Sequence, residues 1–105
     1  IIELKKITKK YHPDTQQMTR IYTQGWLTSM ICAEGLKRAG KNLNPDTLVE
    51  AYETFNNFST GGISAPVSYS KTNHKGGTMN KMYKVDVKNQ TFIPITEFRE
   101  PAFKD

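Results

Sequence analysis

The feature that most constrains the fold is a long helical pattern in the first half of the chain. Small and apolar residues recur at steps of three or four, the spacing of one helix face: Met18, Tyr22, Gly25, Ser29, Ala33, Leu36 and Gly40. The middle of this stripe is small, which suits close approach to a sheet or another helix. Four further apolar residues widen the surface: Trp26, Leu27, Met30 and Ile31. We therefore expect a helix that is buried between two layers.

The flanking residues indicate where this helix begins and ends. Pro13 suits a first helical turn, and Asp14 complements the helix dipole there. Gly40 is the expected end, directly after a turn that contains Lys37 and Arg38. The first ten residues mix apolar and basic residues at a spacing too short to assign.

A second, shorter helix is predicted after a brief turn. Asn44 is a good N-cap, Pro45 fits the first helical position, and Asp46 lies in the first turn. Its apolar face consists of Leu48, Val49, Tyr52 and Phe55, and Asn56 and Asn57 end it.

The second half of the chain changes to a strand pattern. Two glycine pairs, Gly61 with Gly62 and Gly76 with Gly77, indicate structural turns. A short strand is expected at residues 67–70, and longer strands at 78–87 and within 91–98, joined by a tight turn at 88–90. Tyr83, Val85 and Val87 share one face of the middle strand. These segments predict a hairpin with a third strand nearby, a small antiparallel element.

Composition limits the classes of function that remain. The chain has 105 residues, enough for one domain at most, and a hydrophobic fraction of 36%, which predicts a thin core. No apolar run is long enough to cross a bilayer. The net charge is +5, and the one concentrated block is residues 1–13, where Lys5, Lys6, Lys9 and Lys10 stand against Glu3. No aromatic residues alternate with these lysines, so we expect a solvated charged face and no nucleic-acid partner.

The residues that could carry chemistry are few and scattered. The single cysteine, Cys32, excludes a disulfide framework and a cysteine-based zinc site, and we expect it to be a buried small side chain. His12 and His74 lie in separate loops, so no metal site is expected. Two carboxylate pairs, Glu50 with Glu53 and Glu97 with Glu100, should be ordinary solvated groups. We therefore expect no catalytic residues, no enzymatic activity and no cofactor.

Two further segments have an alternative interpretation. The Ser59–Gly62 segment could form an anion-binding nest of backbone N–H groups, but it lacks the spacing of a phosphate loop, and a structural turn is favoured. Trp26 and the tyrosines could line a ligand box, although helical spacing favours a role in the core.

The order of these segments resembles a known family. The pattern Y-x-x-G-W-x-x-x-x-I-C-A-E-G-L-K-R-A-G at 22–40 resembles the long helix near the C-terminus of periplasmic solute-binding proteins of branched-chain amino acid type ABC transporters. K-N-L-N-P-D-T-L-V-E-A-Y-E at 41–53 is similar to that family's next helix. F-S-T-G-G-I-S-A-P-V-S-Y-S at 58–70, N-H-K-G-G at 73–77 and F-I-P-I at 92–95 resemble its glycine turn, next loop and closing hairpin. The ordered succession over residues 11–98 carries the resemblance.

The resemblance implies that residues 1–105 are a single C-terminal segment of a two-lobed α/β protein. The expected fold class is α/β: an incomplete type I periplasmic-binding fold, with two helices followed by largely antiparallel strands. Whole members bind their ligand between the lobes, mainly through loops earlier in the chain, so no ligand-binding residue is carried over to this segment.

The implied function is capture of a small ligand, a branched-chain amino acid or another small organic acid. The ligand is delivered to the membrane permease of an ABC transporter. The protein would act in the periplasm or outside the cell, associated with the membrane through the transporter. The alternative is the ligand-sensing extracellular domain of a signalling receptor with the same fold. Separated from the rest of the lobes, the segment should self-associate through its exposed apolar faces.

Overall fold

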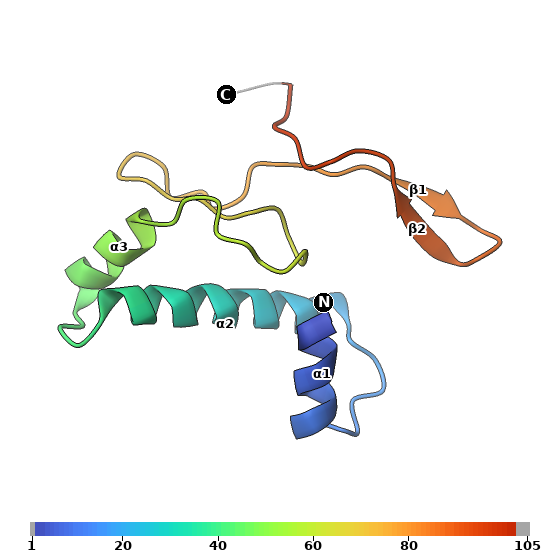
Figure 1. Cartoon of the computed structure of the whole chain (residues 1–105), viewed down its shortest axis with the longest axis horizontal. Helices are drawn as coiled ribbons and strands as arrows, with labels where there is room; N and C mark the ends of the chain where they lie inside the picture. The colour runs from blue at the N-terminus through green and yellow to red at the C-terminus, as the bar shows by residue number, and fades with distance from the viewer. Residues whose placement is uncertain (1, 103–105) are drawn as a thin grey trace.

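A computed structural model describes residues 2–102 of the chain. The elements, in chain order, are α1 (Ile2–Tyr11), α2 (Arg20–Ala39), α3 (Pro45–Glu53), β1 (Tyr83–Asp86) and β2 (Thr91–Pro94). The molecule is flat, with extents of 52 × 41 × 17 Å. Helix α2 forms one long side, α1 and α3 extend from its two ends, and the β1–β2 hairpin projects beyond the loops (Figure 1).

Helix α2 begins later than the sequence pattern predicts. Its N-cap is Thr19, whose Oγ1 accepts a hydrogen bond from the Tyr22 N–H at 3.2 Å. The Pro13–Asp14 start is therefore wrong, because a hydroxyl at residue 19 already satisfies a free N–H group of the first turn. The predicted end is confirmed: Gly40 has a positive φ of 72°, and its N–H donates to the Leu36 carbonyl at 3.1 Å.

Residues 2–11 form a helix that the sequence did not assign. Leu4 and Thr8, one turn apart, are its buried residues. The Thr8 hydroxyl is hydrogen-bonded to the Tyr22 hydroxyl of α2 at 2.9 Å. A ten-residue helix is too short to be stable in water by itself, so contact of this kind with α2 holds it.

Helix α3 begins where it was predicted to begin. The Asn44 side chain accepts hydrogen bonds from the N–H groups of Asp46 and Thr47, each at 3.0 Å, and the Thr47 hydroxyl accepts one from the Asn44 N–H at 3.0 Å. This reciprocal capping, with Pro45 next to the cap, fixes the turn between α2 and α3.

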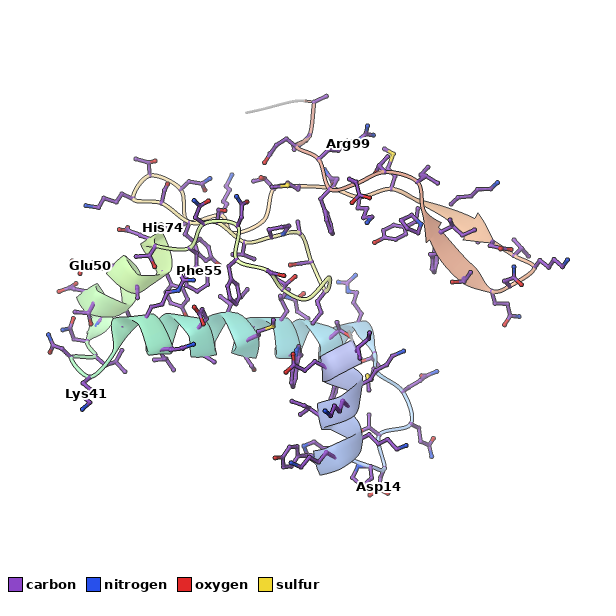
Figure 2. All side chains as sticks on the ribbon, viewed as in Figure 1. Asp14, Lys41, Glu50, Phe55, His74 and Arg99 are labelled. Carbon is purple, nitrogen blue, oxygen red and sulfur yellow. The ribbon has the colours of Figure 1, made fainter. Side chains whose placement is uncertain are left out.

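The core is a small aromatic cluster between α2 and the chain that follows α3. Phe55, which is 1% exposed, lies at its centre (Figure 2). Its ring centroid is 5.6 Å from that of Tyr52, 5.1 Å from that of Phe58 and 5.7 Å from that of Tyr69. The Arg38 guanidinium lies 4.4 Å from the Phe55 centroid and closes the cluster from α2.

The expectation that α2 is buried between two layers is wrong for this structure. Within the described chain, Gly35 is its one buried residue, and the rest of the helix is half-buried or exposed. Segments from α3 and the 58–77 loops cover one side of α2, α1 covers part of its N-terminal end, and the opposite side has no cover (Figure 1). The total accessible surface is 8745 Å², against about 6,000 Å² for a folded monomer of 12.0 kDa.

The hairpin is confirmed, although both strands are shorter than predicted. Strands β1 and β2 pair antiparallel, with Tyr83 opposite Pro94 and Asp86 opposite Thr91. Beyond Pro94, which has no N–H, the Met82 N–H donates to the Thr96 hydroxyl at 2.9 Å. This side-chain bond interrupts the regular ladder.

The predicted third strand is not a strand in the described chain. Residues 67–70 form isolated bridges, between Phe58 and Val67 and between Ser70 and Asn73. The sheet of residues 2–102 has two strands, β1 and β2. Turns lie close to Val67 on both sides, so the ladder of hydrogen bonds does not extend beyond this bridge.

Candidate functional site

A groove lies between α2, α3 and the loop before residue 75. Its volume is about 610 Å³. Its lining combines apolar, aromatic and neutral polar side chains with one histidine: Gln24, Thr28, Ile31, Cys32, Val49, Tyr52, Tyr69 and His74. The groove therefore joins residues from three parts of the sequence.

Tyr52 lies between the groove and the aromatic core. Its ring centroid is 6.0 Å from that of Tyr69, in an edge-to-face arrangement. Burial raises the pKa of the Tyr52 phenol, and a hydrogen bond with the Cys32 side chain adds to the shift. Tyr52 is therefore a neutral hydrogen-bonding group at neutral pH.

Cys32 is exposed, which corrects the expectation of a buried side chain. It lies on α2 at the edge of the groove, because the turn of the helix that carries it is covered on one side alone.

Glu53 is not the ordinary solvated carboxylate that the sequence predicted. Its Oε1 lies 3.1 Å from His74 Nε2, and its side chain is 16% exposed. The contact joins the end of α3 to the loop that carries His74. Glu50, by contrast, is exposed as expected.

At the far end of the chain, Glu97 Oε2 lies 3.6 Å from Lys81 Nζ. Both carboxylate oxygens of Glu100 accept from the Thr78 hydroxyl, at 3.2 and 3.0 Å. Each carboxylate of the predicted pairs is thus solvated or held by a neighbour, and the two members of each pair do not act together.

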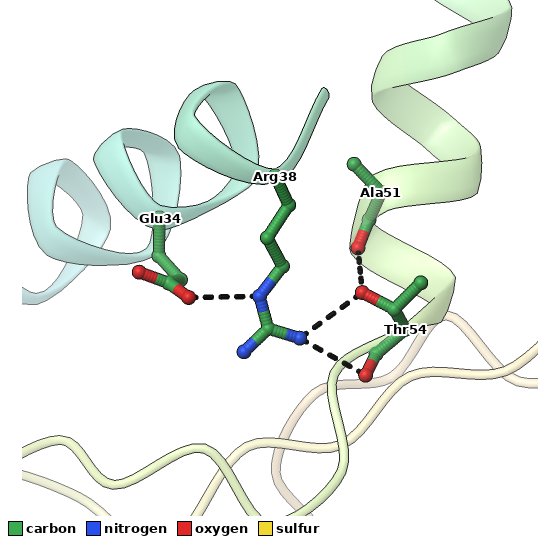
Figure 3. Close-up of polar contacts among 4 residues, drawn as sticks. All are labelled: Glu34, Arg38, Ala51 and Thr54. Carbon is green, nitrogen blue, oxygen red and sulfur yellow. Dashed lines mark hydrogen bonds and ion pairs between the residues drawn. The ribbon is translucent and has the colours of Figure 1, made fainter. Parts of the chain in front are cut away.

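The joint between α2 and α3 is fixed by Arg38 (Figure 3). Its Nε donates to Glu34 Oε1 at 2.8 Å, and its Nη1 donates to both the carbonyl and the hydroxyl oxygen of Thr54 at 3.0 Å. The Thr54 hydroxyl donates to the Ala51 carbonyl at 2.6 Å. The guanidinium thus binds the carbonyl of the C-cap residue of α3, where a cation also complements the helix dipole.

The two predicted glycine turns contain glycine for different physical reasons. Gly61 and Gly62 have positive φ values of 65° and 81°, which few other residues adopt. A Cβ on Gly76 would lie 2.6 Å from the Tyr69 hydroxyl oxygen, so its hydrogen atom makes room for that ring. Gly77 is exposed, and a Cβ there would meet no atom within 4 Å in the described chain.

The Ser59–Gly62 turn is closed by its own side chains. Thr60 is buried, and its hydroxyl donates to the Ser64 carbonyl at 2.8 Å and accepts from the Ser64 N–H at 3.0 Å. The Gly61 N–H donates to the Ser59 hydroxyl at 3.3 Å. This donor is thus already engaged, which favours a structural turn over an anion-binding nest.

The metal-ligating residue types are dispersed over the described residues. His12 lies in the connection after α1, and Cys32 and His74 both line the groove. Within residues 2–102, no group of three His, Cys, Asp or Glu side chains could hold a metal ion.

Two exposed surfaces were less evident from the sequence. On α2, a row of exposed residues runs along the border of the groove, and we call it the free face: Ile21, Gly25, Ser29, Cys32, Ala33 and Leu36, of which Cys32 also lines the groove. On the hairpin, one face presents Tyr83, Val85, Phe92 and Pro94, all exposed. The apolar periodicity located these residues, but it could not say which of them would lack cover.

Comparisons with family models, curated proteins and solved structures found no match for this chain. No helix within residues 2–102 is both long and apolar enough to span a membrane.

Proposed function

We propose that this chain is the C-terminal portion of an extracytoplasmic substrate-binding protein. The whole protein captures a branched-chain amino acid or another small organic acid and delivers it to the permease of an ABC transporter. The observation that carries the proposal is the succession of a long helix, a capped second helix, a glycine turn and a closing hairpin. This is the order that the resemblance implies.

The uncovered surfaces support the proposal that this chain is part of a larger protein. The accessible surface exceeds that of a typical 12 kDa monomer by about 2,700 Å². The free face of α2 accounts for part of it, with Ile21 83% exposed. A larger α/β lobe would bury such a face against its sheet.

The hairpin supports the proposal in the same way. Phe92 is 69% exposed and lies opposite Val85 on one face. An isolated two-stranded hairpin is at best marginally stable in water, so its apolar face requires a covering layer. In the proposed protein these strands run along the hinge and are covered there.

In this proposal the segment itself contributes packing and hinge geometry. The lining of the groove at Tyr52 contains no lysine or arginine, and its one histidine, His74, is engaged with Glu53. The ligand's charged groups are therefore held by other parts of the protein, and no cofactor is required.

A chimera tests the proposal. This chain replaces the corresponding C-terminal portion of a leucine-binding protein of the family, and leucine binding is measured by calorimetry. We expect the chimera to bind leucine, because the host supplies the ligand-contacting residues. A control chimera with Gly35→Leu should fail to bind, since a Cβ at this position already overlaps the Tyr52 ring at 2.7 Å. A chimera that folds cooperatively but binds no leucine would contradict the proposal.

A further inference from the structure

Helix α1 carries all of its lysines on one face. At 100° per residue, these lysines fall within an arc of about 140°, with one isoleucine in its middle. The buried residues of the helix, Leu4 and Thr8, lie on the opposite side. The exposed residues of the arc, which we call the lysine face, are Ile2, Lys5, Lys6, Lys9 and Lys10.

The positive charge of this face is not neutralised within the described chain. Lys5 and Lys9 are four residues apart, as are Lys6 and Lys10, and like charges at this spacing destabilise a helix. The ion pairs within residues 2–102 all lie outside α1. The Lys10 Nζ lies 4.9 Å from the Tyr11 ring centroid, and that ring is a neutral partner. A negatively charged surface would relieve the repulsion.

The lysine face stays at the surface even where this chain is part of a longer protein. Moving an unpaired ammonium group out of water is costly, and an apolar layer over this face would bury four of them together. The kind of covering layer that the hairpin requires therefore does not suit α1. A partner for this face has to carry negative charge.

We propose that the lysine face docks helix α1 on the surface of an anionic lipid bilayer. Clusters of about four to eight basic residues on a helix are typical of binding to acidic lipid headgroups. The four lysines supply the charge, and Ile2, which is 87% exposed among them, enters the headgroup region. The apolar side of α1 remains packed in the fold, so the binding is mainly electrostatic and reversible.

The composition of the face favours lipid over other anionic partners. Lysine carries a compact charge with no fixed hydrogen-bonding geometry, which suits a layer of mobile phosphate groups. Interfaces between proteins are depleted in lysine and enriched in arginine and aromatic residues, and the lysine face has neither. Surfaces that bind nucleic acids combine basic with stacking side chains, whereas Tyr11 lies on the other side of the helix.

The position of α1 makes the face accessible to a flat surface. Helix α1 extends from the N-terminal end of α2, on the side away from the 58–77 loops (Figure 1). Residues 2–14 contain four lysines and two acidic residues, Glu3 and Asp14, so this end of the molecule is positively charged. The docking requires α1 without a captured ligand, so it is independent of the proposed transport function. Its failure would leave the result of the chimera unchanged.

Co-sedimentation of the 105-residue chain with lipid vesicles tests the docking. We expect binding to vesicles of phosphatidylglycerol and phosphatidylcholine in equal parts, and none to phosphatidylcholine alone. Binding should be lost between about 0.1 M and about 1 M salt, because the screening length falls from about 10 Å to about 3 Å. Absence of binding to the anionic vesicles would overturn the proposal, and so would equal binding to both lipids.

Two variants of equal net charge locate the binding surface. Replacing the four lysines of α1 by glutamine should weaken binding by more than about a hundredfold, at about fivefold for each lysine. Glutamine has nearly the helix propensity of lysine, so the circular dichroism spectrum should not change. The control variant should weaken binding by about threefold at most, because its lysines lie outside the docked face. It replaces four exposed lysines outside α1 by glutamine: Lys41, Lys71, Lys75 and Lys88. Equal losses in the two variants would overturn the proposal.

A fluorescent probe reports which part of the chain meets the bilayer. In a Cys32→Ala background, a polarity-sensitive dye on Ile2→Cys should shift to shorter wavelength when anionic vesicles are added. The same dye on Lys88→Cys, at the hairpin turn, should not shift. A shift at residue 88 without one at residue 2 would overturn the proposal. Tighter binding to duplex DNA or to a polyglutamate peptide than to the vesicles, at the same salt concentration, would also overturn it.

Discussion

Helix α2 contains two interior glycines, one buried and one exposed. Gly35 is buried, and a Cβ there would lie 2.7 Å from two carbons of the Tyr52 ring. Gly25 is exposed, and a Cβ there would meet nothing within 4 Å in the described chain. The first glycine is explained by contact with α3, whereas nothing in the described chain explains the second.

The two sides of α2 therefore differ in how they are held. On the covered side, specific contacts at Arg38 and Phe55 fix α3 against α2. On the free side, the side chains are neutral and mostly small, so a partner surface can approach closely without desolvating a charge. Substitutions on the covered side should therefore change the stability of the chain more than substitutions on the free side.

The largest effect is expected for Phe55→Ala. Removing a ring that is 1% exposed leaves a cavity among three other aromatic rings and should cost about 3–5 kcal/mol of unfolding free energy. Urea unfolding followed by circular dichroism measures the loss. Val49→Ala is the control, because Val49 is 46% exposed and its truncation should cost under about 1 kcal/mol. Similar losses for both variants would contradict the position of the core.

The two glycines should respond oppositely to the same substitution. Gly35→Ala forces the Tyr52 ring to move and should cost about 1–3 kcal/mol. Gly25→Ala should instead stabilise the helix, by up to about 1 kcal/mol. Thermal unfolding measures both. A loss of stability at Gly25 under these conditions would mean that the free face is covered within the chain itself.

A smaller effect is expected at the start of α3. Asn44→Ala removes the acceptor of two hydrogen bonds from the first turn and should cost about 1 kcal/mol. Asn44→Asp keeps an acceptor and should retain most of the stability. If both variants unfold like the wild type in urea, the aromatic cluster alone holds α3 against α2, and the Asn44 cap does not contribute to stability.

The smallest effect concerns the hairpin. The Asn89 side-chain amide donates to Asp86 Oδ2 at 2.8 Å, and the Asn89 N–H donates to Oδ1 at 3.2 Å. These hydrogen bonds lower the pKa of the Asp86 carboxyl. A lowered pKa stabilises the folded turn above the ordinary carboxyl pKa, and this contribution is lost as the pH falls through the lowered value.

We therefore expect the Asn89 amide signals in NMR spectra to shift in acid, with a midpoint below the usual aspartate range. Asp86→Asn should abolish this titration. A midpoint at the ordinary aspartate value would show that the turn is open in solution.

The sequence predicted the elements whose signals are local. The cap at Asn44, the end of α2 at Gly40 and the hairpin turn all depend on residues within a few positions of one another. It failed at α1, where a short lysine-rich helix is held by a contact between Thr8 and Tyr22. It also failed at the start of α2, because proline and an acidic residue are common in turns as well as in helix starts.

The candidate site was harder to predict than the elements. Periodicity placed Cys32 and Glu53 on their helices, but their exposure depends on which side of α2 is covered, and that is set by long-range packing. The contact between Glu53 and His74 spans 21 residues and has no signal in the local pattern. The family resemblance added a function to these elements, and that function stays a proposal.

The thickness of 17 Å has a consequence for hydrogen exchange. A body this thin holds about two layers of side chains, so most backbone amides lie close to bulk water and can exchange through small local openings. Protection should be greatest where α2 meets α3 at Gly35 and weaker toward α1. It should be weakest in the hairpin, where one apolar side is uncovered. A partner that settles on the free face would then be visible as slowed exchange in the middle of α2, even before its identity is known.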